Sequence, residues 1–212
     1  MNEQKKVPLW RNPYVLIFIG GAIVLTLMRP MLRRDPKPPP VDGVLPLFSL
    51  TSERGEKMGS TELAGQVYVA NFLFTSCTTV CPLTVTSLQK LQKRYEERNV
   101  PVRIVSFSVD PNTDTPEVLR AYAEKSGADA KRWTFLTGAE PEIRKVMDGF
   151  LLSLEPKKTM GNGLMDIAHS QKLVIVDGRG ALRGFYASDD EGLDEVFHRS
   201  QQVLYEAKRQ TN

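Results

Sequence analysis

Cysteine and histidine are scarce in this sequence: among 212 residues there are two of each, Cys77 and Cys81, and His169 and His198. Two cysteines exclude a disulfide-stapled scaffold and a zinc site built from four cysteines. Glycine (15 residues) and proline (14 residues) are too few for a fibrous or low-complexity chain. The content of hydrophobic residues, 41%, is instead typical of a globular protein. A chain of this length can bury a full hydrophobic core without disulfide or metal cross-links.

The folded part of the chain also lacks an excess of charge of either sign. The formal net charge is +3, but residues 1–37 contain seven Lys or Arg and two acidic residues, whereas the rest contains 21 basic and 23 acidic residues. The basicity therefore belongs to the N-terminal segment, and the remainder is near neutral. Such a balance gives no electrostatic reason to expect nucleic-acid binding.

One stretch near the N-terminus has no charge at all. Residues 14–28 (YVLIFIGGAIVLTLM) are uncharged, and extending the segment to residues 13–32 adds only Arg29. Twenty helical residues rise about 30 Å, which matches the hydrocarbon core of a bilayer. Neither a small-residue cleavage site nor a lipid-accepting cysteine follows the run. We therefore expect residues 1–12 to be a basic tail and residues 13–32 an uncleaved transmembrane signal anchor, whose orientation the flanking charges do not determine.

Proline is concentrated directly after this segment, in the run DPKPPP at residues 35–40. Such runs favour the polyproline II conformation, which is stiff and extended. We therefore expect residues 33–43 to be a linker that separates the anchor from a domain formed by residues 44–212.

Strands and helices alternate along the predicted domain. A continuous apolar run at residues 66–74 and a second at 102–109 are typical of strands buried on both faces of a sheet. Thr115 and Pro116 are the expected N-cap and first residue of a helix that ends near Lys125. The full expected order is an extended segment at 44–50, a turn-rich connection at 51–59, strands at 66–74, 102–109, 132–136, 171–176 and 181–186, and helices at 83–98, 116–125, 141–152 and 191–208. This pattern predicts an α/β domain with a central mixed sheet flanked by helices.

The two cysteines lie at the junction between the first buried strand and the first helix, in Cys77-Thr78-Thr79-Val80-Cys81-Pro82. At four residues apart near a helix N-terminus, they share one face, and the helix dipole there favours a thiolate. The polar residues between them should leave the sulfurs approachable. Three interpretations remain open, namely two structural core cysteines, a dithiol that cycles to a disulfide, and a soft-metal site with one further ligand.

His169 can supply that further ligand, because it directly precedes the strand at 171–176. A strand–CxxxCP–helix unit resembles the thioredoxin-like fold, in which the loop before this strand lies across from the cysteine turn. His198 falls in the middle of the last helix, and we interpret it as a solvated surface residue. Met160 and Met165 have soft sulfur atoms near His169 but are more simply explained as packing residues.

Several further motifs resemble the SCO/SenC family of membrane-anchored copper proteins for cytochrome c oxidase assembly. Besides the cysteine motif and His169-Ser170, these motifs are Asn71-Phe72-Leu73-Phe74-Thr75, Ser108-Val109-Asp110-Pro111, Asp114-Thr115-Pro116-Glu117 and Leu136-Thr137-Gly138. The resemblance covers about residues 41–208. It implies a thioredoxin-like fold behind one transmembrane helix, with the domain in the periplasm or, in mitochondria, in the intermembrane space.

The resemblance also assigns residues to a copper site. It implies that Cys77, Cys81 and His169 are the ligands of one copper ion, Cu(I) and also Cu(II), and that Asp110 supports the site from nearby. The sequence departs from the family pattern in three places. Thr79 replaces an acid before the second cysteine, Ala168 replaces an acid before the histidine, and the stretch before His169 is short and rich in glycine.

Three functions follow from these residues. The first is a copper metallochaperone that delivers copper to the binuclear site of cytochrome c oxidase subunit II. The second is a thiol–disulfide oxidoreductase in which Cys77 and Cys81 act on the cysteines of a partner, and this function needs no His169. The third is a copper or redox sensor, which would not be an enzyme.

Overall fold

The computed structural model describes residues 13–32, 39–77, 81–151 and 172–210. The chain divides into two compact units, Met1–Lys37 and Pro38–Asn212. Within the first unit, α1 (Pro13–Leu32) covers the segment predicted to be a membrane anchor. Among the helices of the described residues, however, none combines the length and the apolar character that a membrane crossing requires. The predicted transmembrane span is therefore not confirmed.

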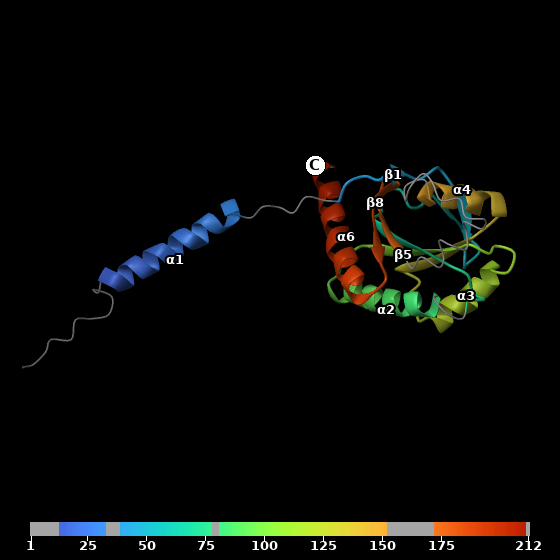
Figure 1. Ribbon diagram of the computed structural model, residues 1–212, viewed down its shortest axis with the longest axis horizontal. Helices are drawn as coiled ribbons and strands as arrows, with labels where there is room; N and C mark the ends of the chain where they lie inside the picture. The colour runs from blue at the N-terminus through green and yellow to red at the C-terminus, as the bar shows by residue number, and fades with distance from the viewer. Residues whose placement is uncertain (1–12, 33–38, 78–80, 152–171, 211–212) are drawn as a thin grey trace, which may run out of the picture. The chain divides into compact units, whose positions relative to one another are not determined.

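The second unit is built on a mixed sheet with the strand order β1-β8-β7-β4-β5-β6-β2-β3 (Figure 1). The neighbours β4, β5 and β6 are parallel, and the other pairs are antiparallel. The strands are β1 (Gly43–Val44), β2 (Ser49–Ser52), β3 (Lys57–Gly59), β4 (Tyr68–Leu73), β5 (Arg103–Ser108), β6 (Trp133–Thr137), β7 (Lys172–Val176) and β8 (Ala181–Ala187).

Helices cover both faces of this sheet. The helices are α2 (Cys81–Glu97), α3 (Pro116–Lys125), α4 (Glu140–Leu151) and α6 (Asp190–Gln210). Right-handed crossovers from β4 to β5 and from β5 to β6 advance in the same direction, so α2 and α3 lie on one face. Helix α6 packs beside α2, and α4 covers the opposite face near β1 and β2 (Figure 1).

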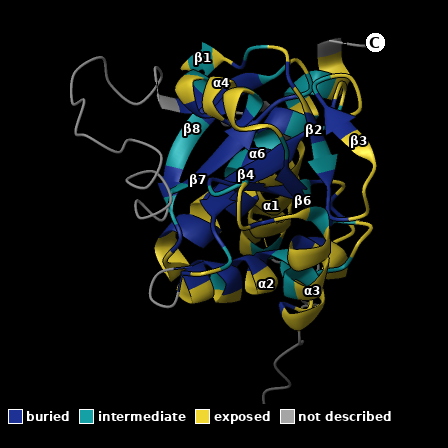
Figure 2. Ribbon diagram, turned by 90° about the vertical axis from the view of Figure 1, so that its right-hand side faces the viewer, coloured by how far each residue is buried: buried dark blue, intermediate teal, exposed yellow. Residues whose placement is uncertain are grey.

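The central strands form the core, as their apolar runs predict. Every residue of β4 and β6 is buried, and Figure 2 shows the sheet as the dark interior beneath half-exposed helices. Phe72, Phe107 and Phe150 join the sheet to α4, with ring centroids 4.9 Å apart between Phe72 and Phe150 and 5.7 Å apart between Phe107 and Phe150. Edge-to-face contacts of this kind stabilise the core beyond the area that they bury.

The α/β class, the mixed sheet and the expected core strands are confirmed. Thr115 caps α3 as predicted, because its hydroxyl accepts a hydrogen bond from the Val118 N–H, and Pro116 is the first helical residue. The prediction of a turn-rich connection at 51–59 is wrong, since this stretch contributes to the β2–β3 hairpin. The short strands at this edge alternate too little in hydrophobicity to be recognised from the sequence.

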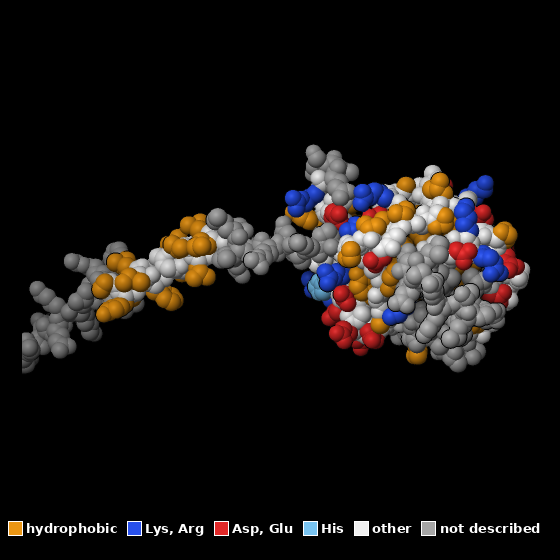
Figure 3. All heavy atoms as spheres, turned by 45° about the horizontal axis from the view of Figure 1, so that its top comes forward, with side chains coloured by type: hydrophobic (Ala, Val, Ile, Leu, Met, Phe, Trp, Pro, Cys, Tyr) orange, Lys and Arg blue, Asp and Glu red, His pale blue; other side chains and the backbone are white. Residues whose placement is uncertain are grey.

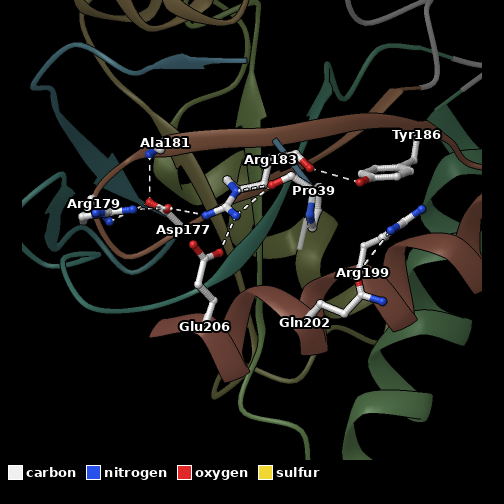
Figure 4. A network of polar contacts seen from close by, with 9 residues as sticks. All are labelled: Pro39, Asp177, Arg179, Ala181, Arg183, Tyr186, Arg199, Gln202 and Glu206. Atoms are coloured by element: carbon white, nitrogen blue, oxygen red, sulfur yellow. Dashed lines mark hydrogen bonds and ion pairs between the residues drawn. The ribbon is translucent and has the colours of Figure 1, made fainter. Parts of the chain in front are cut away.

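A buried arginine ties three separate parts of the domain together (Figure 4). Arg183 on β8 is only 3% exposed, and its guanidinium donates to the Pro39 carbonyl oxygen at 2.8 and 3.0 Å. It also donates to Asp177 Oδ2 at 3.1 Å and to Glu206 Oε2 at 2.5 Å. Asp177 in turn accepts the N–H groups of the β7–β8 turn. The arginine therefore fixes the start of the domain to the hairpin and to the last helix.

Charged side chains of both signs lie on the face of the domain that Figure 3 shows. Asp and Glu side chains gather at its lower left, whereas Lys and Arg side chains lie mainly along its upper edge.

Candidate functional site

The structure brings Cys77 and Cys81 together at the carboxyl end of β4. Cys77 lies in the turn after the strand, where its N–H donates to the Phe74 carbonyl oxygen at 3.1 Å. Cys81 is the first residue of α2, and its N–H donates to Cys77 Sγ at 3.4 Å. The Cys77 sulfur thus satisfies one of the N–H groups that a helix N-terminus leaves unpaired. Both cysteines are thiols and are not joined by a disulfide.

Burial decides the acidity of Cys81. Its side chain is 2% exposed, and loss of hydration raises the pKa of the Cys81 thiol to about 12. A backbone hydrogen bond with Phe74 lowers the pKa, whereas contact with Cys77 and the charge of Asp114 raise it further. The expectation of approachable sulfurs with thiolate character is therefore wrong for Cys81, because desolvation outweighs the helix dipole.

This shift predicts how the stability of the reduced domain depends on pH. An unfolded Cys81 loses its proton near pH 9 and the folded thiol only near pH 12, so the unfolded state is favoured increasingly as the pH rises between these values. We expect Cys81→Ala to remove a slope of up to about 1.4 kcal/mol per pH unit from the free energy of unfolding. Urea unfolding of both proteins between pH 8.5 and 10 measures this slope, and the difference between them removes the contribution of the tyrosines, which both proteins share. Equal slopes in the unmodified domain and in Cys81→Ala would show that folding does not raise the pKa of the Cys81 thiol.

A buried carboxylate holds the cysteine turn to the neighbouring strand. Asp114 is 0% exposed and accepts hydrogen bonds from the N–H of Thr75 at 3.2 Å and from its hydroxyl at 2.5 Å. It also accepts the hydroxyl of Ser108, the last residue of β5, at 2.6 Å. Because β4 and β5 are parallel neighbours, both strands end here. Asp114 therefore fixes the residue two positions before Cys77.

Asp110, the predicted supporting residue, lies in the same turn after β5. Its N–H donates to the Ser108 hydroxyl at 3.1 Å, and its carbonyl oxygen accepts from the N–H groups of Thr113 and Asp114. All of its hydrogen bonds to described residues are made by its backbone. A role for its carboxylate at the site stays a prediction.

Tyr122 on α3 is a further neighbour of the cysteines. Burial raises the pKa of its phenol to about 12, and negative charge on Cys81, Cys77 and Asp114 adds to the effect. Its ring packs edge-to-face on Phe135 at 6.1 Å. Sequence reasoning missed both Asp114 and Tyr122 as members of the site, although Asp114 belongs to a motif that it had noted.

The remaining predicted ligands lie outside the described residues. These are His169, with Met160 and Met165 near it in the sequence. In the described ranges, no cluster of three or more His, Cys, Asp or Glu side chains is arranged to hold a metal. His198 lies on α6 as an exposed residue, as predicted, with its ring against Phe197.

The chemistry of the cysteine pair suits a soft metal or a two-electron redox step. Two neighbouring sulfur donors are the kind of ligands that Cu(I) prefers, and a bound copper ion would replace their protons. Loss of two protons and two electrons would instead join the sulfurs in a disulfide. The same residues therefore fit copper as cargo and also a redox role, although the two states exclude one another.

The mixed sheet, with a CxxxCP turn between its central strand and the following helix, places the protein in the thioredoxin-like class. The chain belongs to the SCO1/SenC family, whose model matches residues 38–204. A SCO1 protein homolog of Bacillus subtilis is 36% identical over 152 residues, which are 70% of this chain and 77% of the relative.

Solved structures agree with this assignment. BsSco, described as a member of the Sco family of cytochrome c oxidase assembly proteins with a disulfide switch, superposes with a TM-score of 0.65 at 27% identity, covering 80% of this chain and 98% of BsSco. Yeast Sco1 with copper bound shares the fold, with a TM-score of 0.59 at 18% identity, covering 75% and 93% of the two chains.

Proposed function

We propose that this protein binds one copper ion through Cys77, Cys81 and His169 and delivers it for the assembly of cytochrome c oxidase. The observation that carries the proposal is the pair of thiols held side by side, in which the Cys81 N–H donates to Cys77 Sγ at 3.4 Å. Membership of a family that includes cytochrome c oxidase assembly proteins supports the oxidase as the destination of the copper ion. The binuclear copper site of oxidase subunit II is the acceptor that we propose.

The raised pKa of the Cys81 thiol would make copper binding depend on pH. Because burial raises the pKa of the Cys81 thiol to about 12, the folded protein at neutral pH holds a proton there that copper must displace. Copper affinity therefore falls as the pH is lowered. Three ligands leave one side of the ion open, so an acceptor thiolate can join before a donor thiolate leaves.

A competitive titration of Cu(I) into the reduced domain tests the role of His169. We expect one equivalent to bind, and His169→Ala to lower the affinity by more than about 100-fold, because even residues that only support metal ligands are worth 10–100-fold. His198→Ala is the matched control, since His198 is exposed on α6, and it should leave the affinity unchanged. An unchanged affinity in His169→Ala would remove His169 from the site.

A thiol–disulfide oxidoreductase is the second candidate, favoured by the proximity of the two reduced cysteines. In that reaction the Cys77 thiolate attacks a partner disulfide, and one partner sulfur leaves as a thiolate. Cys81 then resolves the mixed disulfide, which leaves a Cys77–Cys81 disulfide and a reduced partner. This function should be lost in Cys77→Ser, as copper binding should be, but it should survive His169→Ala, so His169→Ala distinguishes the two candidates.

We propose that residues 13–32 tether the domain to a membrane, with the domain in the periplasm or an equivalent compartment outside the cytoplasm. The support is the uncharged run at residues 14–28 and the proline-rich linker behind it. Alkaline extraction of membranes from cells that express the full chain would test the tether, since a spanning segment stays in the pellet.

A further inference from the structure

A groove of about 950 Å³ lies at the end of the domain away from the cysteines. The parallel strands β4, β5 and β6 begin at this end, whereas the cysteine turn follows the last residue of β4. Helices α2 and α6 end beside it. Its polar lining includes Gln66, Glu96, Arg103, Lys131, Arg132 and Lys208. Neither the copper proposal nor the redox proposal uses this region.

The groove carries an excess of positive charge. Four of its lining residues are basic, Arg103, Lys131, Arg132 and Lys208, and two are acidic, Glu96 and Asp129. Neither Arg103 nor Arg132 forms an ion pair with a carboxylate of the described residues. This differs from Arg183, the buried arginine elsewhere in the domain, which is matched by two carboxylates.

Arg103 combines partial burial with incomplete hydrogen bonding. It is half-buried, and its Nη1 and Nη2 donate only to neutral oxygens, Gln66 Oε1 at 3.3 Å and Thr134 Oγ1 at 3.0 Å. Its Nε is buried without an acceptor among the described residues. Burial lowers the pKa of Arg103, and the nearby positive charge of Arg54 adds to this effect, which Glu53 opposes. A partly desolvated guanidinium without a counter-charge costs free energy that an anion would offset.

Arg132 presents a second guanidinium in the same groove. It is half-buried, and its Nη1 donates to the Val100 carbonyl oxygen at 2.9 Å, which fixes the side chain without neutralising it. Lys131, which directly precedes Arg132 in the chain, is exposed and adds a further positive charge. Guanidinium groups present paired N–H donors whose spacing matches the oxygens of a phosphate.

We propose that this groove is a binding site for a phosphate group, with Arg103 and Arg132 as its principal donors. Arg103 and Arg132 together offer two positive charges without a carboxylate partner among the described residues, which match the two charges of a phosphate dianion. The phosphate can come from a soluble phosphate monoester or from the headgroup of a lipid. Since the site is remote from Cys77 and Cys81, phosphate binding should not require copper.

Thermal unfolding of the domain that starts at Pro38 tests the site, because this unit is compact and contains its own hydrophobic core. We expect the melting temperature to rise with inorganic phosphate at constant ionic strength, relative to chloride. Arg103→Gln and Arg132→Gln should each weaken the apparent affinity for phosphate by about 10–100-fold, as expected for the loss of a charged hydrogen-bond donor. The measured quantity is the phosphate-dependent shift, which a general loss of stability does not mimic.

Arg144→Gln is the matched control, because Arg144 lies on α4 and is paired with Glu140. It should keep the full phosphate shift. Sedimentation with vesicles of phosphatidylcholine, alone or with added phosphatidic acid, distinguishes a lipid headgroup from a soluble phosphate monoester as the source of the phosphate. Binding to phosphatidic acid that is lost in Arg103→Gln assigns a lipid headgroup, and a phosphate shift without vesicle binding assigns a soluble ligand. No phosphate shift in the unmodified domain, or an equal shift in Arg103→Gln, would overturn the proposal.

Discussion

Replacing either cysteine by serine should lower the affinity of the reduced domain for Cu(I) by more than about 100-fold. Residues that only orient metal ligands are worth 10–100-fold, so the loss of a sulfur donor should exceed that range. Serine keeps the approximate shape of the side chain but offers a hard oxygen that Cu(I) does not favour. A competition titration with a Cu(I) chelator of known affinity measures the effect for Cys77→Ser and Cys81→Ser separately.

Thr84→Ser is a suitable control for these variants. Thr84 is buried on α2, one turn after Cys81, and the substitution shortens a side chain in the same helix without removing a sulfur. We expect the control to bind Cu(I) as the unmodified domain does. If Cys81→Ser retained full affinity while folding normally, Cys81 would not be a ligand and the copper proposal would fail.

Replacing Arg183 by methionine should destabilise the domain by about 3–5 kcal/mol. The substitution removes the cation from a buried network and takes one charged donor from each of Asp177, Glu206 and the Pro39 carbonyl oxygen (Figure 4). Removal of one member of a buried charge pair costs this much because the Asp177 carboxylate stays buried when its buried cation is gone. Urea unfolding at pH 7 measures the loss of free energy.

Arg199→Met provides the comparison for an arginine in a more exposed pair. Arg199 lies on α6, is 38% exposed and pairs with Glu195 one turn away. Such a pair is worth less than about 1 kcal/mol, so the control should unfold near the midpoint of the unmodified domain. A similarly small loss for Arg183→Met would show that the buried network contributes little to stability.

The sequence was sufficient to predict the central part of the fold. The apolar runs at residues 66–74 and 102–109 mark strands buried on both faces, and they coincide with β4 and β5. The cap formed by Thr115 and Pro116 marks the start of α3. These signals are local and strong, because continuous hydrophobicity and capping residues have few alternative explanations.

Other features depend on contacts between distant residues, which a single sequence does not display. The raised pKa of Cys81 results from packing of the whole strand–helix junction around it, whereas the sequence shows only a polar turn and a helix N-terminus. Likewise, the hydrogen bonds of Asp114 join Thr75, 39 positions before it in the chain, to Ser108. The short strands β2 and β3 are identified by their antiparallel pairing in the structure, which the sequence alone does not indicate.

The sequence and the structure contribute different parts of the proposed copper site. The sequence predicts Cys77, Cys81 and His169 as ligands, and the structure places the first two together, with Asp114 holding the turn before them. His169 lies outside the described residues, so its membership depends on experiment. The pair of sulfurs is therefore the part of the site that the structure supports in detail.

X-ray absorption at the copper K-edge of the reduced domain loaded with one equivalent of Cu(I) tests the central claim most directly. We expect scattering from two sulfur atoms and one nitrogen atom, with one sulfur lost in Cys77→Ser and the nitrogen lost in His169→Ala but retained in His198→Ala. Coordination by oxygen and nitrogen alone, or a spectrum that neither cysteine substitution changes, would contradict the assignment of this thiol pair as a copper site.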